Sequence, residues 1–539
     1  MKRNKKVALT ATALSLSAIL AACGTDEEKT TTSTADGEKE LNLLITSEPP
    51  SLHPQLASDT TSGAILENAF EGLTTMKNGE PVLGAAEDYI VSDDLLTYTF
   101  KLRDAQWSNG EKVTAEDFAY AWLWALNPEN ASEYSTILYP IKGAEAYNNA
   151  KATAEDVAIN VIDEKTLEVT LEAPTPYFLE LTAFKTFFPI HKATAEANPK
   201  WYTEADTYVG NGAYTLSSWN HSGDIVLEKS ETYWDAANVA IDTVNVAMVE
   251  SETTQMTMYD AGEVDFLGAP YGTISLDAID RLKSEDALNV TDLAGIYWYK
   301  FNTKDPVMQN ENIRKALTLA IDREALVSNI VKGEQPPALG MVPDSVAGFG
   351  DDEGYFKDAD FAEAKKYLEA GLKELGLASA KDLEVKVSYN TSEAHSSIAQ
   401  FIQQGWTSEL GITVKLDNAE WQVYLDKLSN GDFQIGRLGW GADYNDAYSF
   451  LEMYNSATNG NNQTGWSNDE YTNLLKASTT ETDAAKRTEM LQQAEEIIME
   501  EMPVAPVYYQ TNLFISHDNV ENMAPDALGN INLKFVDVK

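Results

Sequence analysis

Apolar and polar residues alternate along this chain with two periods, one typical of strands and one typical of helices. Alternation at every second position predicts strands at 40–46 and 98–103. Apolar groups at helical spacing predict a helix at 62–73, and the capping box Thr114-Ala-Glu-Asp117 predicts a helix that ends near Leu126. This alternation of strands and helices predicts α/β domains rather than a β-sandwich or a helical bundle. The same patterns predict further strands at 161–171, 214–227, 383–389, 412–416 and 504–515 and helices at 311–331, 360–375, 394–410 and 484–501.

Residues 1–23 have the three parts of a secretory signal: a basic start, an apolar run rich in small residues, and Leu20-Ala-Ala-Cys23. The run is too short for a membrane-spanning helix. Cys23 is the only cysteine, and its motif matches the bacterial lipobox, in which the cysteine becomes the lipidated, palmitate-carrying first residue of the mature protein. The sequence thus predicts a signal peptide at 1–22 and a lipid anchor at Cys23 on the outer face of a Gram-positive bacterial membrane. Residues 23–40 then form a flexible tether, since 24–40 contain no large apolar residue.

The length of the mature chain, about 500 residues, suggests three or so domains. We find no fixed-period repeat and no linker that would separate independent modules. Two aromatic runs, 174–178 and 184–189, are interpreted as core or interface packing. We therefore expect domains that lie against one another, with a ligand site in the cleft between them.

The charge of the chain excludes some partners without identifying a site. Lysine and arginine number 39 against 85 aspartates and glutamates, which gives a formal charge of −46 at pH 7. Nucleic acid and anionic lipid are therefore not expected as partners. A hydrophobic content of 43% still indicates a globular chain.

The sequence contains no motif of a common catalytic mechanism: no Gly-x-Ser-x-Gly, no Walker A loop and no His-Glu-x-x-His. Lipidation would also consume the only thiol. The histidines lie too far apart for a recognisable zinc spacing. We therefore predict no catalytic residue, no metal site and no cofactor. The histidines are His53, His191, His221, His395 and His517.

One stretch, 435–446, combines opposite charges with aromatic residues and glycines. Arg437 and Asp443 lie six positions apart in Ile-Gly-Arg-Leu-Gly-Trp-Gly-Ala-Asp-Tyr-Asn-Asp. Full extension would separate the two charges by about 20 Å, but three glycines permit turns that bring them closer. Such a pair would suit a short zwitterion, with Trp440 and Tyr444 as aromatic contacts. The same residues also fit ordinary turn chemistry, so the residues alone leave both interpretations open.

Residues 84–118 closely resemble the signature of the bacterial extracellular solute-binding proteins of family 5, the oligopeptide-, dipeptide- and nickel-binding components of ABC importers. Further similar stretches lie at 48–52, 210–214, 313–324 and 503–509, so the resemblance covers nearly the whole mature chain. It implies an α/β, two-lobed periplasmic-binding-protein-like fold of type II, cluster C, with an extra inserted domain. The implied divisions are lobe I at 41–67, 201–290 and 510–539, the inserted domain at 68–200, and lobe II at 291–509.

The run at 435–446 is similar to the oligopeptide-binding branch of this family, which implies roles for single residues. Asp443 matches the aspartate that binds a peptide's α-ammonium group, and Arg437 matches an arginine that meets a C-terminal carboxylate. His395 matches the histidine that serves the carboxylate of a longer peptide, and Trp421 matches a pocket tryptophan. Without the resemblance, Trp421 would be interpreted as a core residue and His395 as an exposed residue at a helix start.

The resemblance implies a lipid-anchored monomer that is not an enzyme. It would close two lobes around a short peptide and deliver it to the transmembrane subunits of an ABC permease, which cytoplasmic ATPases drive. A receptor for a signalling peptide or pheromone would share the fold and differ in specificity. The alternative from another class is a surface peptidase or chaperone that uses the same cleft.

Overall fold

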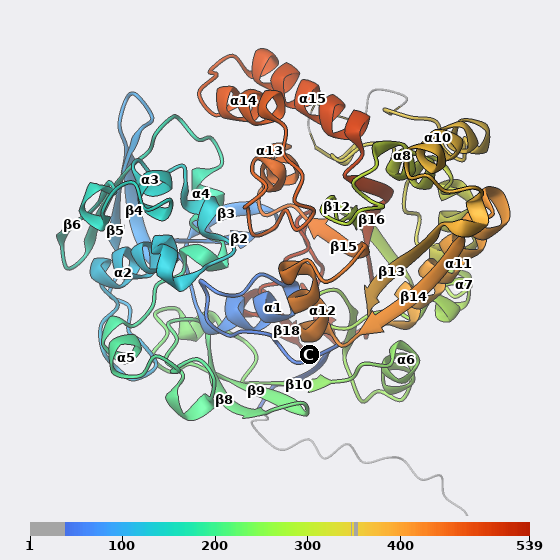
Figure 1. The fold of residues 1–539 in the computed structure, drawn as a ribbon. Coiled ribbons are helices and arrows are strands. Elements are labelled where there is room, and N and C mark those ends of the chain that lie inside the picture. Colours follow the sequence, from blue (N-terminus) through green and yellow to red (C-terminus); the bar gives the residue numbers. More distant parts are fainter. Residues whose placement is uncertain (1–37, 347, 350–353) are drawn as a thin grey trace, which may run out of the picture. The chain divides into compact units, whose positions relative to one another are not determined.

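Two four-stranded sheets and one six-stranded sheet carry the fold in the computed structural model, which describes residues 38–346, 348–349 and 354–539 (Figure 1). The predicted signal peptide and Cys23 lie outside the described residues and stay predictions. Residues 39–539 form one compact unit.

The first sheet has the order β1 (Glu40–Ile45), β10 (Thr243–Met248), β9 (Asp224–Lys229), β8 (Tyr214–Asn220). The second has the order β4 (Ala86–Val91), β5 (Thr97–Leu102), β7 (Thr166–Thr170), β6 (Ile159–Asp163). The six-stranded sheet has the order β11 (Phe266–Gly268), β16 (Val504–Ser516), β12 (Asn289–Phe301), β15 (Ile435–Gly441), β13 (Glu384–Asn390), β14 (Thr413–Ala419).

The longer helices follow amphipathic stretches of the sequence. They are α1 (Thr60–Ala69), α2 (Ala115–Leu126), α6 (Glu252–Asp260), α8 (Glu311–Leu319), α10 (Phe361–Glu374), α11 (Glu393–Leu410), α12 (Trp421–Asn430), α14 (Asp469–Ser478) and α15 (Ala484–Glu501). The shorter helices are α3 (Ala144–Asn148), α4 (Phe178–Leu181), α5 (Lys192–Ala197), α7 (Ile279–Ser284), α9 (Arg323–Leu326) and α13 (Tyr448–Leu451). Four short strands, β2 (Thr74–Lys77), β3 (Glu80–Leu83), β17 (Val520–Glu521) and β18 (Asp537–Val538), form two separate pairs.

Most of the predicted elements are confirmed, and their ends have local causes. Thr114 caps α2 as predicted, because its backbone N–H donates to the Asp117 carboxylate over 2.9 Å. The strand predicted at 161–171 is instead the hairpin β6–β7, since the Asp163 carboxylate accepts from the Lys165 N–H at 2.9 Å and forms a turn. The strand predicted at 214–227 is likewise the hairpin β8–β9, with Ser222 at a φ of 59° in its turn.

The helix predicted at 311–331 is also corrected. The structure ends α8 at Leu319 and begins α9 after Asp322, whose side chain accepts a hydrogen bond from the Ala325 N–H at 2.9 Å. A π-helix follows at Val327–Val331. An aspartate that bonds the backbone ahead of it favours a new helix start over continuation of the old helix.

The six-stranded sheet separates two hydrophobic clusters, because successive side chains of a strand face opposite ways. On β12, Tyr297 and Tyr299 belong to the cluster under α8, α10 and α11, whereas Trp298 belongs to the other cluster. Trp406 of α11 anchors the first cluster and donates its indole N–H to the Leu317 carbonyl at 2.9 Å. A fully buried aromatic side chain satisfied in this way adds about 2–3 kcal/mol of hydrophobic stabilisation.

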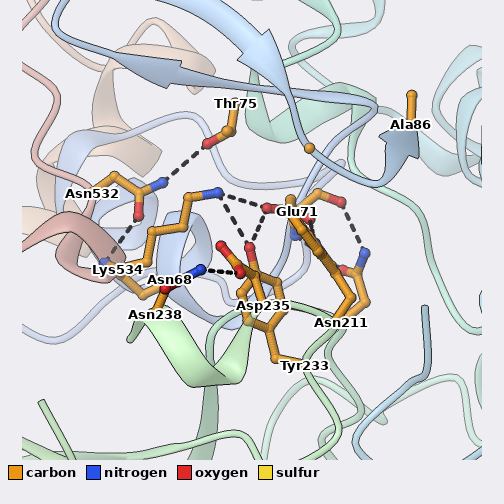
Figure 2. Close-up of polar contacts among 12 residues, drawn as sticks. Asn68, Glu71, Thr75, Ala86, Asn211, Tyr233, Asp235, Asn238, Asn532 and Lys534 are labelled. Atoms are coloured by element: carbon orange, nitrogen blue, oxygen red, sulfur yellow. Dashed lines mark hydrogen bonds and ion pairs between the residues drawn. The ribbon is translucent and has the colours of Figure 1, made fainter. Parts of the chain in front are cut away.

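The C-terminal tail is tied to the end of α1 by a buried ion pair, shown in Figure 2. The Lys534 ammonium lies 2.6 Å from the Glu71 carboxylate, and both side chains are less than a tenth exposed. Glu71 also accepts from the Tyr233 hydroxyl at 2.5 Å, and its backbone pairs with the Asn211 side chain. Because each charge is paired and hydrogen-bonded, the cost of burying it is offset.

The sheets draw on the segments into which the resemblance divides the chain. The first sheet uses residues of the implied lobe I, and β4 to β7 lie in the implied inserted domain. Two long strands, β12 and β16, run across the implied boundaries at 290/291 and 509/510. The boundaries themselves stay predictions. Within the described part of the chain, no helix combines the length and the apolar character that a membrane span requires.

Candidate ligand-binding site

A cavity of about 1150 Å³ lies between the sheets. Its wall is formed by α1, the segment 183–188, the starts of α11 and α12, β15 and the middle of β16. Five of the six residues predicted as ligand contacts line it: Arg437, Asp443, His395, Trp421 and Trp440. The tertiary fold therefore brings together side chains that lie up to 48 positions apart in the sequence.

The glycine-rich stretch is a strand and not a turn. β15 pairs with β12 in antiparallel register from Gly295↔Gly441 to Phe301↔Ile435. Its three glycines, Gly436, Gly439 and Gly441, are absent from the glycines with positive φ in the described residues. The glycines therefore do not turn the chain within β15, and Arg437 lies in the strand while Asp443 follows two residues after its end. Both residues line the cavity.

The glycines of β15 leave space beside the strand that side chains would fill. A Cβ on Gly439 would lie 3.0 Å from the Gln510 amide and 3.3 Å from the Ile296 carbonyl oxygen. A Cβ on Gly441 would meet nothing within 4 Å, so this residue leaves the cavity open beside β15. The glycine pattern thus exposes strand backbone to the cavity.

β15 also has an edge that no other strand covers. Its parallel partner β13 pairs with it only at Val387↔Ile435 and Ser388↔Gly436. In the described residues, positions 437–441 therefore have a neighbouring strand on the β12 side alone. The Arg437 carbonyl already accepts from the Tyr424 hydroxyl at 2.7 Å, and the remaining N–H and C=O groups of this edge are ones that an added strand can bond.

Asp443 lies just beyond the end of β15 with its carboxylate at the cavity. No cation of the described residues lies within ion-pair distance of that carboxylate. Burial raises the pKa of Asp443 to about 7, although the Lys185 charge and a hydrogen bond from Tyr134 oppose the rise. A half-buried anion without an ion-pair partner is well suited to receive a ligand cation.

Arg437 and His395 meet around Tyr297 at another part of the wall. The Arg437 guanidinium lies 4.6 Å from the Tyr297 ring centroid and donates to the Asn390 side-chain oxygen at 3.1 Å. The Tyr297 hydroxyl lies 3.5 Å from Nδ1 of His395. Burial, and secondarily the Arg437 charge, hold the pKa of His395 well below its usual value. This part of the site therefore combines a fixed cation with a neutral imidazole.

The aromatic residues occupy different environments. Trp440 stacks on Tyr134 with ring centroids 6.0 Å apart and an interplanar angle of 5°. Trp421 begins α12 and lines the cavity. Tyr444 is 1% exposed, stacks on Tyr177 at 4.2 Å, and does not belong to the described cavity wall. Tyr444 lies in the bend after β15, and its ring packs against Tyr177 instead of the described cavity wall.

Comparison with known proteins gives this geometry its context. The family model for bacterial extracellular solute-binding proteins, family 5 middle, matches residues 80–462. This chain belongs to that family. The family protein OppA of Bacillus subtilis strain 168, an oligopeptide-binding protein, is 48% identical over 524 residues, which cover 95% of this chain and 96% of the relative. The structure of Listeria monocytogenes OppA bound to peptide has a TM-score of 0.86 at 30% identity and covers 94% of this chain and 100% of that chain.

The family's fold, with two lobes of mixed α/β structure, is thus confirmed, as is the resemblance that implied it. Another family member, the murein tripeptide-binding protein MppA of Escherichia coli, has a TM-score of 0.88 at 29% identity, and the match covers 94% of this chain and 99% of that chain. The unliganded open form of MppA has a TM-score of only 0.62 over a similar coverage. The arrangement described here therefore departs from the open form.

Contacts between α6 and α11 hold this arrangement beside the cavity. Glu252, the first residue of α6, accepts from the Ser392 hydroxyl at 2.5 Å and from the Ala394 N–H at 3.2 Å, at the N-terminus of α11. Glu393, the first residue of α11, accepts in return from the Ser251 and Thr253 hydroxyls at the N-terminus of α6. Each helix thus supplies a carboxylate to the positive end of the other. His395 lies in the first turn of α11, so these contacts also position a cavity residue.

Sequence reasoning missed a group of charged residues opposite β15. Asp59, Glu67 and Lys185 line the cavity and were not singled out. Lys185 stands in the aromatic run 184–189, which was interpreted as packing. A lysine inside an apolar run is itself a signal, because burial of an ammonium group requires nearby carboxylates or aromatic rings.

Proposed function

We propose that this protein captures oligopeptides between its two lobes and delivers them to an ABC permease for uptake. The observation that carries the proposal is the pairing of an exposed strand edge, 437–441, with an anion at one end and a cation at the other. An extended peptide has the same three features: backbone groups that can join a strand, an α-ammonium group and a carboxylate. The relative named an oligopeptide-binding protein, and the structure of Listeria monocytogenes OppA bound to peptide, support the proposal.

Recognition would depend mainly on groups that every peptide shares. The N-terminal ammonium would pair with Asp443, and a charge-assisted bond of this kind contributes about 1.5–3 kcal/mol. The peptide backbone would add to the free edge of β15, which gives affinity independent of side chains. Arg437 would receive the carboxylate of a peptide short enough to fit, and His395 would serve a longer one. Trp421 and Trp440 would supply apolar walls to a hydrated cavity.

The proposal also covers the place of the protein in the cell. Cys23 would carry the lipid that anchors the monomer to the outer face of the membrane, close to the transmembrane subunits that receive the peptide. No step of the proposal breaks a covalent bond. Cell fractionation tests the anchor: Cys23→Ala should move the protein from the membrane fraction to the medium, and a variant that stays with the membrane would contradict it.

Native mass spectrometry of the soluble part of the chain from residue 24, as purified and after unfolding and refolding, tests peptide capture. We expect a spread of bound masses of a few residues each, which refolding removes and an added free-N-terminus tripeptide restores. The matched N-acetylated tripeptide should bind at least about tenfold more weakly, because the cation that pairs with Asp443 is gone. A single retained mass would favour a dedicated signal receptor, and cleavage of the added peptide would favour a peptidase. Failure of every added peptide to bind would overturn the proposal.

A further inference from the structure

One face of α1 presents two carboxylates to the cavity. Asp59, Gly63 and Glu67 are spaced four positions apart and all line the wall. Residues at this spacing lie above one another on a helix. Asp59 caps the helix and accepts from the N–H and the hydroxyl of Ser62 at 2.9 and 2.7 Å. The Glu67 carboxylate, unlike its helical backbone, has no hydrogen bond or ion pair to another group among the described residues.

Lys185 lies over the middle of this helix face. Its Cδ atom is 4.0 Å from the position that a Cβ on Gly63 would occupy. The lysine stem therefore passes the helix face at Gly63, between Asp59 and Glu67, at ordinary van der Waals distance. The side chain is 8% exposed, and its ammonium lies 4.0 Å from the Phe184 ring centroid and 5.0 Å from that of Tyr134. It forms no ion pair within 4 Å with any described residue.

The charges at this end of the cavity do not balance. Three carboxylates, those of Asp59, Glu67 and Asp443, act on the single Lys185 ammonium. Two other acids of the wall differ, since Glu71 is paired with Lys534 and Glu48 with His221. One ligand cation at Asp443 would still leave one more carboxylate than ammonium groups. A buried excess charge of this kind is costly unless a second cation arrives or a proton binds.

We propose that this end of the cavity selects peptides whose first residue carries a cationic side chain, with Glu67 as the group that receives it. The proposal rests on the proposed function, because the α-ammonium group must occupy Asp443 for the first side chain to lie near α1. Burial raises the pKa of Glu67 to about 7, and the Lys185 charge opposes the rise. A second ligand cation would favour ionised Glu67 in the same way.

Isothermal titration calorimetry with two tripeptides tests this inference, Lys-Ala-Ala and norleucine-Ala-Ala, which differ by the ammonium group of the first side chain. We expect the lysine peptide to bind at least about tenfold more tightly to the wild-type protein, the value of one charge-assisted hydrogen bond. Glu67→Gln should reduce this ratio to less than about threefold. Glu231→Gln, which removes an exposed carboxylate outside the cavity wall, should keep the wild-type ratio and so control for net charge.

The affinities of the two tripeptides distinguish a failure of the side-chain preference from a failure of peptide capture. Equal affinities of the wild-type protein for the two peptides would overturn the side-chain preference and leave peptide capture intact. A tenfold ratio that persists in Glu67→Gln would overturn the role of Glu67. If neither peptide binds, capture itself fails. Because the wild-type ratio decides the preference, the inference stays testable even if Glu67→Gln does not fold.

Discussion

The two charged parts of the cavity differ in how much of their charge the protein already satisfies. Asp443 faces a single buried lysine that it shares with two further carboxylates. Arg437 already donates to Asn390 at 3.1 Å and lies against the Tyr297 ring. An incoming ammonium at Asp443 therefore finds a charge with no ion-pair partner, whereas an incoming carboxylate at Arg437 competes with existing contacts. The difference predicts strict recognition of the peptide's N-terminus and tolerant recognition of its C-terminus.

The largest effect is expected at Asp443. Asp443→Asn removes the charge and keeps the shape, so a bound ammonium loses its counter-ion at a position that the protein partly buries. Removal of one partner from a buried charge pair costs about 2–5 kcal/mol, so tripeptide affinity measured by calorimetry should fall about 30-fold or more. Asp432→Asn, at an exposed aspartate in the turn before β15, is the matched control and should bind normally. A loss of affinity of less than about threefold in Asp443→Asn would contradict strict recognition of the peptide's N-terminus by Asp443.

Arg437 should show a smaller effect that depends on the ligand. For a tripeptide with a free carboxylate, Arg437→Gln should weaken binding by about tenfold or less, because part of the guanidinium's interaction energy is already taken up by Asn390 and Tyr297. For the same tripeptide with an amidated C-terminus, the substitution should change little. Equal affinity of the wild-type protein for the acid and the amide would show that Arg437 does not read the carboxylate at all.

The sequence alone predicts those parts of the fold that local patterns determine. The long amphipathic stretches predicted at 394–410 and 484–501 form α11 and α15, and the capping box at Thr114 begins α2. Turns were harder to predict, since the hairpins at 159–170 and 214–229 depend on single polar side chains inside otherwise strand-like patterns. Helix α12 was missed, although Glu420 caps it by accepting from the Val423 N–H.

The site was predictable only in part, for a different physical reason. Arg437 lies in β15 and Asp443 only two residues beyond its end, so one continuous stretch of sequence supplies both charges to the cavity. Glu67, Lys185 and Asp443 come from three distant segments, and only tertiary packing brings them to one cavity. Tyr444 follows Asp443 but stacks on Tyr177 outside the described cavity wall, and this too depends on tertiary packing, because both residues lie in bends beyond the end of β15.

The smallest effect is expected from a change of pH. The pKa shifts in the two charged parts of the cavity have opposite signs. Burial raises the pKa of Asp443 to about 7, whereas the pKa of His395 lies well below its usual value. Between pH 7.5 and 6, Asp443 should therefore gain a proton while His395 stays neutral. Tripeptide affinity should fall by up to about tenfold over this interval, because the ammonium pairs only with the ionised carboxylate.

The stability of the peptide-free protein should change in the opposite direction. The folded-state pKa of Asp443 lies above the unfolded value of about 3.9, so the folded state binds this proton more tightly and its contribution to stability is lost as pH rises through 7. Lowering the pH from 7.5 to 6 should thus raise the melting temperature of the wild-type protein relative to Asp443→Asn, while it weakens peptide binding. The comparison between the two proteins removes the effect of groups that both retain, which include Glu67, Glu452 and Lys185 near the carboxylate. If the two melting temperatures change in parallel and peptide affinity stays constant, Asp443 is already ionised at pH 6. Burial then does not destabilise its charge, and its selectivity for an ammonium group must come from geometry.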